Sequence, residues 1–377
     1  MPPLSLYIHI PWCIQKCPYC DFNSHKSPNQ LPEQQYIECL LADLENDLPS
    51  CAPPPIQSIF LGGGTPSLLS AEAYRQLFEG LTRLSIITDN LEITLEANPG
   101  AVEQQRFRDY RALGINRLSL GIQSFNSDHL KKLGRIHDDQ QAHQAIESAR
   151  LAGFDNLNLD LMHGLPGQTI AEGIHDLQIA LSYQPEHLSW YQLTIEPNTI
   201  YYKQQPILPN EHIIAAIEAS GLALLKEQGF NHYEISAFCQ PKHESRHNLN
   251  YWLFGDYYGI GAGAHGKFTV SQNQIVRSRK YKQPKDYMNK ERSFIAERNT
   301  LTQNDLIFEF MLNTTRLNQK IELSLFSERT NLSVDILLPH LKHAQSKGLI
   351  NLEDHSWQVT ELGRRYTNNL QALFILD

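Results

Sequence analysis

The sequence predicts an α/β fold, in which a parallel sheet is built from strands that alternate with helices and a small helical domain follows. Three observations predict it. Short apolar runs alternate with helical patterns in the first half of the 377-residue chain, glycines stand where those helices should end, and mostly helical patterns follow from about residue 301. Six strands separated by helices imply a partial (β/α)6 barrel.

The elements of the predicted barrel follow one another in order. Apolar runs indicate strands near residues 4–9, 58–61, 92–97, 117–121, 157–162 and 187–193. Helical patterns lie between them near residues 35–48, 71–84, 102–113, 140–152 and 171–181. Gly114 and Gly153 each follow a helix directly and precede the next strand by a few residues, as a glycine at a helix C-terminus does.

A third region follows the sixth strand. It contains a helical pattern near residues 212–228, a short strand near 232–235 and a Gly-rich loop at 255–266. The helix ends at Gly229, again in the position of a C-terminal glycine. We expect this region to close the open side of the barrel.

The C-terminal residues are expected to form a separate helical domain. Thr302, Ser333 and Thr360 can each cap the N-terminus of a helix, and the first two helices would run to about residues 316 and 347. With the short strand expected at 357–359, this arrangement resembles a winged helix. We therefore predict two domains, residues 1–300 and 301–377.

Composition and charge limit the possible partners. The chain is 41% hydrophobic and 19% charged, with a formal net charge of −9, which repels nucleic-acid phosphates and anionic membranes. Residues 301–377 hold seven Lys and Arg against nine Asp and Glu, so we expect no nucleic-acid partner in spite of the winged-helix pattern. The N-terminus resembles no signal peptide and no apolar run reaches 18 residues, so we expect a cytoplasmic protein without an integral membrane segment.

Three of the six cysteines lie within eight residues of one another. Cys13, Cys17 and Cys20 form a C-x3-C-x2-C motif just after the first strand. In a reducing compartment such a group indicates metal or redox chemistry more often than disulfides. Three thiolates would leave one iron of a [4Fe-4S] cluster free to bind another ligand. The alternative is a structural zinc site completed by His9 or His25.

Polar residues and glycines recur after the predicted strands. Ligands collect at the carboxyl ends of parallel strands, so these residues are candidates for one binding site. The remaining cysteines, Cys39, Cys51 and Cys239, are scattered and are expected to be ordinary thiols. The strand-end segments are Gly62–Ser67, Glu96–Pro99, Gly121–Phe125, Leu133–His137 and Asn158–Thr169.

The segment Tyr7-Ile-His-Ile-Pro-Trp-Cys13, together with Cys17-Pro-Tyr19-Cys20, resembles the opening of radical S-adenosylmethionine (SAM) proteins of the oxygen-independent coproporphyrinogen III dehydrogenase family. The resemblance covers nearly the whole chain and implies a partial radical SAM barrel. It also implies that the amino and carboxylate groups of SAM bind the fourth iron, and that an electron donor serves the cluster. The positions that match SAM-binding residues of the family are Tyr7, Tyr19, Gly64, Thr65, Glu96, Gln123, Arg135 and Asp160.

Two features indicate which branch of that family the chain resembles. The dehydrogenases resemble C-x3-C-x2-C-x-C, whereas here Phe22 takes the place of the fourth cysteine. His247-Asn-Leu-Asn-Tyr251-Trp252 matches the H-N-x-x-Y-W motif of the family's haem chaperones. An imidazole can bind haem iron, and the two aromatic rings offer flat faces to a macrocycle. Without the resemblance, the same segment is typical of a histidine beside two core aromatics.

The sequence therefore predicts a haem chaperone that binds haem with the help of His247 and transfers it to an unidentified acceptor protein. One alternative is a radical SAM enzyme that acts on a porphyrinogen or another substrate. The other is a zinc-stabilised binding module without redox chemistry. His9 and His265 are not expected to be iron ligands: His9 should pack near the cluster, and His265 should lie at the barrel mouth.

Overall fold

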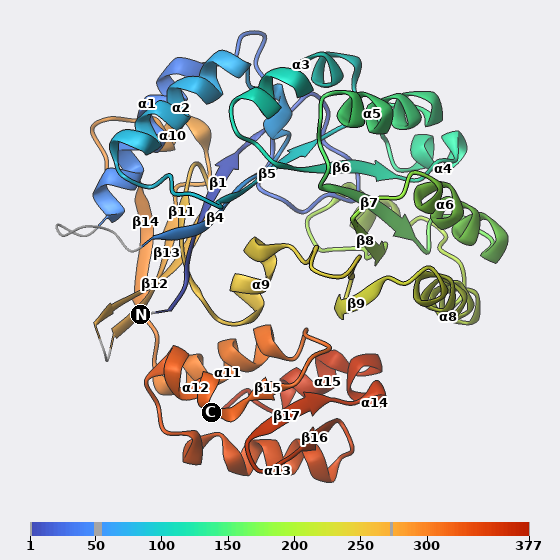
Figure 1. Cartoon of the computed structure of the whole chain (residues 1–377), viewed down its shortest axis with the longest axis vertical. Helices are drawn as coiled ribbons and strands as arrows, with labels where there is room; N and C mark the ends of the chain where they lie inside the picture. Colours follow the sequence, from blue (N-terminus) through green and yellow to red (C-terminus); the bar gives the residue numbers. More distant parts are fainter. Residues whose placement is uncertain (1, 49–54, 272–273, 377) are drawn as a thin grey trace.

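The computed structural model describes residues 2–48, 55–271 and 274–376 (Figure 1). Within these residues, one sheet of twelve strands has the order β14-β13-β12-β11-β1-β4-β5-β6-β7-β8-β10-β9. The seven strands from β11 to β8 are parallel, and the strands at both edges are antiparallel. The predicted α/β class and partial barrel are therefore confirmed.

Most of the elements match the expected ranges closely, but β11 and α4 were not predicted. The parallel strands are β11 (Asp256–Ile260), β1 (Leu4–Ile10), β4 (Ile56–Gly63), β5 (Glu92–Ala97), β6 (Arg117–Gln123), β7 (Leu157–His163) and β8 (His187–Gln192). The helices on their outer face are α1 (Glu33–Asp47), α2 (Ala71–Arg83), α3 (Ala101–Ala112), α4 (Ser127–Lys132), α5 (Asp139–Leu151), α6 (Ile170–Ser182) and α8 (Glu211–Glu227). Figure 1 shows these helices arranged around the outside of a curved sheet.

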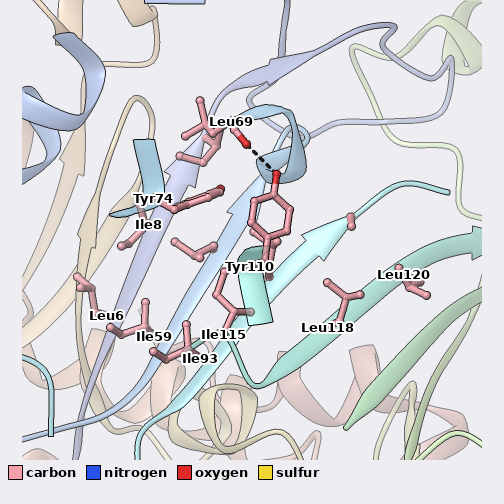
Figure 2. Close-up of a cluster of buried hydrophobic side chains, with 14 of the residues drawn as sticks. Leu6, Ile8, Ile59, Leu69, Tyr74, Ile93, Tyr110, Ile115, Leu118 and Leu120 are labelled. Carbon is pink, nitrogen blue, oxygen red and sulfur yellow. Dashed lines mark hydrogen bonds between the residues drawn. The ribbon is translucent and has the colours of Figure 1, made fainter. Parts of the chain in front are cut away.

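Side chains alternate between the two faces of the strands. Leu6 and Ile8 of β1 point outward into a buried apolar cluster beneath the helices (Figure 2). In the same cluster, the Tyr110 hydroxyl donates to the carbonyl oxygen of Leu69 at 2.7 Å, which satisfies the polar end of a fully buried ring. The residues that alternate with these along the strands point to the inner face of the sheet and are mostly polar. The strands therefore have one apolar face, which the layer of outer helices covers, and one mostly polar face.

The sheet does not close into a complete barrel. Its edge strands, β14 (Ile295–Thr300) and β9 (Asn231–Glu234), are not paired with each other in the described residues. The expectation that residues 212–266 close the barrel is therefore wrong. These residues extend both edges instead, and β10 (Ala237–Cys239), β12 (His265–Ser271) and β13 (Gln274–Lys280) complete the extensions.

The Gly-rich segment is largely strand and not loop. Gly259 lies inside β11, where a Cβ atom would be 1.8 Å from the carbonyl oxygen of His265 in β12. The glycine allows the two backbones to approach this closely. The intervening turn contains Gly261 and Gly263, both with positive φ.

The C-terminal residues have a second buried core. Their elements are α11 (Gln303–Thr314), β15 (Ile321–Glu322), α12 (Leu323–Thr330), α13 (Leu338–Ser346), β16 (Ile350–Leu352), β17 (Ser356–Val359), α14 (Glu361–Arg365) and α15 (Thr367–Ala372). Phe254 and Ile275 from the preceding region join this core, so the two parts of the chain pack together.

No helix of the described residues is long and apolar enough to cross a membrane.

Two details of this part differ from the prediction. The sequence pattern did not indicate α12. The helix expected at 333–347 is instead a 3-10 turn at Val334–Ile336 followed by α13. Pro339 lies in the first turn of α13, where proline is accepted, whereas inside one continuous helix it would remove a backbone hydrogen bond.

A buried ion pair joins α1 to β13. The Lys280 ammonium donates to Asp43 at 2.5 Å and to Asp47 at 2.7 Å, and its side chain is fully buried. Tyr287 also donates to Asp43, at 2.7 Å. Buried charges are tolerated only when they are paired in this way. The network therefore fixes the antiparallel extension to the barrel.

Replacing Lys280 should destabilise the protein strongly. Lys280→Met leaves two carboxylates buried without their cation, and we expect a loss of about 3–5 kcal/mol in the free energy of unfolding. Urea unfolding followed by circular dichroism measures it. The control is Lys290→Met, because the Lys290 to Glu38 pair is exposed and should contribute at most about 1 kcal/mol. Equal losses in both variants would contradict the role given to Lys280.

Candidate functional site

The cysteine loop follows β1 at the carboxyl end of the sheet. Within it, Trp12–Cys13 (β2) pairs with His25–Lys26 (β3), and the Cys20 amide donates to the Cys17 carbonyl at 3.1 Å. Cys13, Cys17 and Cys20 are free thiols that line one cavity of about 480 Å³. The loop thus gathers the three predicted ligands around a shared space.

The other cysteines lie apart from this loop. Cys39 is buried in α1 and Cys239 in β10, and both are free. Neither lines the 480 Å³ cavity. Cys51 lies outside the described residues.

The chemistry of the loop fits a metal cluster. Burial raises the pKa of the Cys13 and Cys20 thiols and so disfavours their thiolate forms. A metal ion bound to the sulfur atoms would favour the thiolate forms. Among the described residues, no three His, Cys, Asp or Glu side chains lie close enough together to hold a single metal ion. The finding concerns single ions, since each cysteine of a [4Fe-4S] cluster binds a different iron.

Seven of the eight predicted SAM residues face the same cavity as the cysteines. Tyr7 does not, and lines a second cavity beside it. The cysteine cavity also contacts Asn98, Ser119, Ser189 and Tyr191. The seven are Tyr19, Gly64, Thr65, Glu96, Gln123, Arg135 and Asp160.

The glycine edge of β4 packs against the cysteine loop. A Cβ atom on Gly64 would lie 2.6 Å from the carbonyl oxygen of Trp12. Gly63 has a φ of +113°, and a Cβ atom there would lie 2.6 Å from the His9 ring. The glycines are therefore needed for the contact between the two loops. The Gly64 amide donates to the carbonyl of Ile10 at 2.7 Å, so it is already satisfied by protein.

Two carboxyl groups lie on the inner face of the sheet and contact the cavity. Burial, reinforced by the charge of Asp160, raises the pKa of Glu96 to about 8. The Gly63 amide donates to Glu96 at 3.1 Å. Burial also raises the pKa of Asp160, against the effect of its hydrogen bonds. A positively charged ligand in the cavity would favour both carboxylates.

Asp160 has partners that the sequence alone did not identify. Its two oxygens accept hydrogen bonds from the Ser119 hydroxyl and the Asn158 side-chain amide, both at 2.8 Å. These hydrogen bonds compensate for the burial of the acid in an apolar strand. The available signal was the two-residue period, which places Asn158 and Asp160 on one face of β7.

Gln123 reaches the cavity through an irregularity in β6. The pairing of β6 with β7 shifts register between Leu120 and Gln123. Gln123 has a φ of +68°, which is unusual for a residue other than glycine. Its side-chain oxygen accepts a hydrogen bond from the Tyr191 hydroxyl at 2.9 Å. Such a bulge redirects a side chain, which in a regular strand would point to one of the two faces in strict alternation.

Arg135 connects the cysteine loop to the strand ends. Its guanidinium donates to Asn98 at 2.6 Å, to the Gly121 carbonyl at 2.8 Å and to the Cys17 sulfur at 3.6 Å. The guanidinium therefore already lies beside the predicted cluster ligands. A carboxylate ligand would have to share or replace one of these contacts.

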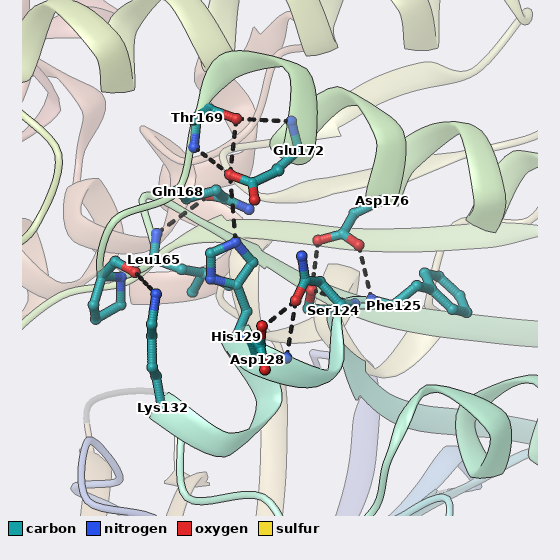
Figure 3. A network of polar contacts seen from close by, with 12 residues as sticks. Ser124, Phe125, Asp128, His129, Lys132, Leu165, Gln168, Thr169, Glu172 and Asp176 are labelled. Atoms are coloured by element: carbon teal, nitrogen blue, oxygen red, sulfur yellow. Dashed lines mark hydrogen bonds and ion pairs between the residues drawn. The ribbon is translucent and has the colours of Figure 1, made fainter.

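The helix before Arg135 is held by a polar network (Figure 3). Lys132 at the end of α4 donates to the Pro166 carbonyl at 2.9 Å. Asp176 of α6 accepts hydrogen bonds from the Ser124 hydroxyl at 2.7 Å and the Phe125 amide at 2.8 Å. These contacts tie the segment after β6 to the segment after β7. They restrict the position of the chain that carries Arg135.

His247 lies on the short helix α9 (Arg246–Trp252), inside the curve of the sheet. Its ring is 1% exposed and stacks on Phe60 with centroids 5.0 Å apart. Its Nδ1 lies 3.0 Å from the Ser58 hydroxyl, and its Nε2 lies 3.0 Å from the Tyr251 hydroxyl. Burial lowers the pKa of His247 to about 3, so the ring is neutral.

A second cavity of about 860 Å³ adjoins the first. The two share Cys20, Phe22, Gly63 and Glu96 among their lining residues. Phe22 is 60% exposed at this boundary. The wall of the second cavity also includes residues of β1, β11 and the turn before β12. The site thus has two connected compartments at the carboxyl end of the sheet.

The raised pKa of Glu96 predicts a pH dependence of stability. Its folded pKa of about 8 lies above its ordinary value of 4.5, so its contribution to stability is full below about pH 4.5 and is lost as the pH rises towards 8. Between pH 5.5 and pH 8 the free energy of unfolding should therefore decrease less in Glu96→Gln than in the parent. The two decreases should differ by at least about 1.4 kcal/mol. Denaturant unfolding without added ligands measures this.

The matched control is Glu45→Gln, because Glu45 is an exposed residue of α1. It should keep the pH dependence of the parent. If the stability profiles of Glu96→Gln and the parent were parallel over this range, the raised pKa would be contradicted.

Comparison with known proteins places the chain in a family. The family model of the Radical SAM superfamily matches residues 7–178, and that of the HemN C-terminal domain matches residues 301–366. Coproporphyrinogen III oxidase (HemN) from Escherichia coli has a similar fold, with a TM-score of 0.83 and 24% identity over 99% of this chain and 90% of that one.

Relatives of higher identity match from end to end. Heme chaperone HemW from Escherichia coli is 45% identical over 377 residues, which cover 100% of this chain and 99% of the relative. Heme chaperone HemW from Haemophilus influenzae is 46% identical over 381 residues, with the same two coverages. The protein of that name from Bacillus subtilis is 34% identical and matches 98% of this chain and 99% of its own. The chain therefore belongs to the HemW family of radical SAM proteins.

Proposed function

We propose that this protein is a haem chaperone, which binds haem and transfers it to an acceptor protein. We further propose that it carries a [4Fe-4S] cluster on Cys13, Cys17 and Cys20, with exchangeable SAM on the fourth iron. The observation that carries the proposal of a cluster with SAM is the convergence of the three cysteines and seven candidate SAM residues on one cavity. The acceptor protein and an electron donor for the cluster are the partners that this function requires.

The geometry around the cysteines supports the cluster and SAM. SAM has an amine, a carboxylate, a sulfonium cation and ribose hydroxyls. The cavity has groups suited to each, since Arg135 can pair with a carboxylate, and Glu96 and Asp160 can accept hydrogen bonds or balance a positive charge. When bound, the reduced cluster would supply the electron for SAM chemistry, while the protein positions both and excludes water.

The second cavity supports haem as the cargo. Its volume of about 860 Å³ is in the range of cofactor sites, and Tyr251 of the H-N-x-x-Y-W motif lines it. His247 does not line it but lies behind Tyr251, to which it is hydrogen-bonded. We therefore propose that His247 assists haem binding by holding Tyr251 in position.

The role of the cysteines is tested by a pair of substitutions. Cys17→Ser should abolish the brown colour of the reconstituted protein, lower its iron and sulfide content and weaken SAM binding at least tenfold. Cys39→Ser is the control, because Cys39 is buried in α1 away from the cavity. Iron and sulfide analysis with equilibrium dialysis of SAM measures both. A colourless protein that binds stoichiometric zinc would instead support the zinc module.

Haem transfer tests the chaperone function directly. The haem-loaded, cluster-containing protein is mixed with an apoprotein acceptor, and the two are then separated by chromatography. We expect haem to move intact to the acceptor, and the Cys17→Ser variant shows whether transfer depends on the cluster. If the protein bound no haem, or kept all of it in the presence of a competent acceptor, the proposed function would be wrong.

A further inference from the structure

The iron ligand of the proposed haem site can be inferred from the histidines around the second cavity. This inference rests on the proposed function, because it concerns the haem that a chaperone would carry. Three histidines lie at or next to the cavity. His9 and His265 line it, and His247 lies behind Tyr251. An iron ligand must present a free ring nitrogen to the cavity.

His9 does not present a free nitrogen. Its Nδ1 lies 2.9 Å from the Tyr7 hydroxyl, and its Nε2 lies 2.9 Å from the Asn23 carbonyl. The first contact lies within β1, and the second joins β1 to the segment after the cysteines. Binding iron would require one of these buried hydrogen bonds to break.

His247 is engaged in the same way. Ser58 and Tyr251 occupy its two nitrogens, and the Ser58 hydroxyl is also 2.8 Å from that of Ser5. The ring stacks on Phe60 and does not line the cavity, whereas its hydrogen-bond partner Tyr251 does. A haem that reached this imidazole would have to displace Tyr251 and open the buried chain of hydroxyl groups. The position fits a residue that orients Tyr251 better than an iron ligand.

His265 differs from both. It is exposed at the start of β12 and lines the cavity, and neither ring nitrogen has a hydrogen-bond partner among the described residues. The turn before it is fixed, because the Asn23 side chain donates to the Ala262 carbonyl and the Lys280 amide donates to the Ala264 carbonyl, each at 2.9 Å. A Cβ atom on Gly263 would lie 2.2 Å from the Asn23 side chain. The backbone therefore holds a free imidazole at a defined place.

We propose that His265 would bind the iron of a haem held in the second cavity. This assignment differs from the sequence-based expectation that His265 only lies at the barrel mouth. The aromatic rings of Tyr251, Tyr257 and Phe22 on the same cavity offer flat faces to the macrocycle. The ligand would thus come from the first residue of β12, while Tyr251 of the H-N-x-x-Y-W motif contributes to the wall.

The charges on the cavity fit the two carboxylates of haem. Lys16 and Lys282 line it and can pair with them. Asp21 and Glu196 also line it, so the positive charge is local and not general. Lys282 is two residues from the end of β13 and exposed, which leaves its ammonium free to reach a carboxylate. The lysines would therefore hold the carboxylates of haem, with Lys282 free to do so and Lys16 sharing its ammonium with the Phe22 carbonyl, to which it donates at 2.9 Å.

The test is a haem titration of the cluster-containing protein, followed by absorption and electron paramagnetic resonance spectroscopy. His265→Ala should weaken ferric haem binding at least tenfold and remove the spectral signature of histidine ligation. Added imidazole should restore that signature, because it can enter the space left by the side chain. His212→Ala, an exposed residue of α8, is the matched control and should behave like the parent.

His247→Ala tests the alternative that His247, and not His265, binds the haem iron. We expect it to weaken haem binding but to leave the histidine signature of the bound haem unchanged. If His265→Ala kept the signature and His247→Ala lost it, the assignment of His265 would be wrong while the chaperone function stood. If the parent itself bound no haem, the proposed function would fail first.

Discussion

Most polar side chains on the inner face of the sheet are buried and hydrogen-bonded to one another, and this constraint organises the site. Within the described residues, the Thr94 hydroxyl is an exception. Asp160 uses Ser119 and Asn158, while His247 uses Ser58 and Tyr251. An unpaired buried group would cost free energy comparable to a lost hydrogen bond or more. The inner face therefore carries separate hydrogen-bonded groups, and the two cavities lie beside them at the carboxyl end of the sheet.

The same constraint separates structural from ligand-facing groups. A side chain that holds two elements together has its polar atoms occupied, as both ring nitrogens of His9 are. A side chain that is available to a ligand faces a cavity with unoccupied atoms, as His265 does within the described chain. Residue type alone does not distinguish the two, since both are histidines with glycines close by. The difference arises from the partners that the fold brings to each.

Much of the site could be predicted because parallel strands end at one edge of a sheet. The cysteine loop, Glu96 and Asp160 reach one cavity for that reason, and Arg135 reaches the same cavity from the segment after α4. The burial of His247 could not be predicted, because its partner Ser58 is 189 residues away in the chain. The antiparallel extension was missed because the glycines that allow close strand contact at Gly259 look like loop residues in a sequence.

The central claim is that the two cavities serve a carrier of haem and not an enzyme that consumes a porphyrinogen. Phe22 stands at their boundary, where the sequence departs from the dehydrogenase motif. The most direct measurement is an anaerobic assay of the reconstituted protein with SAM, a low-potential reductant and coproporphyrinogen III, analysed by chromatography. The account predicts SAM binding or cleavage with the porphyrinogen recovered unchanged. Protoporphyrinogen formed together with deoxyadenosine would contradict it.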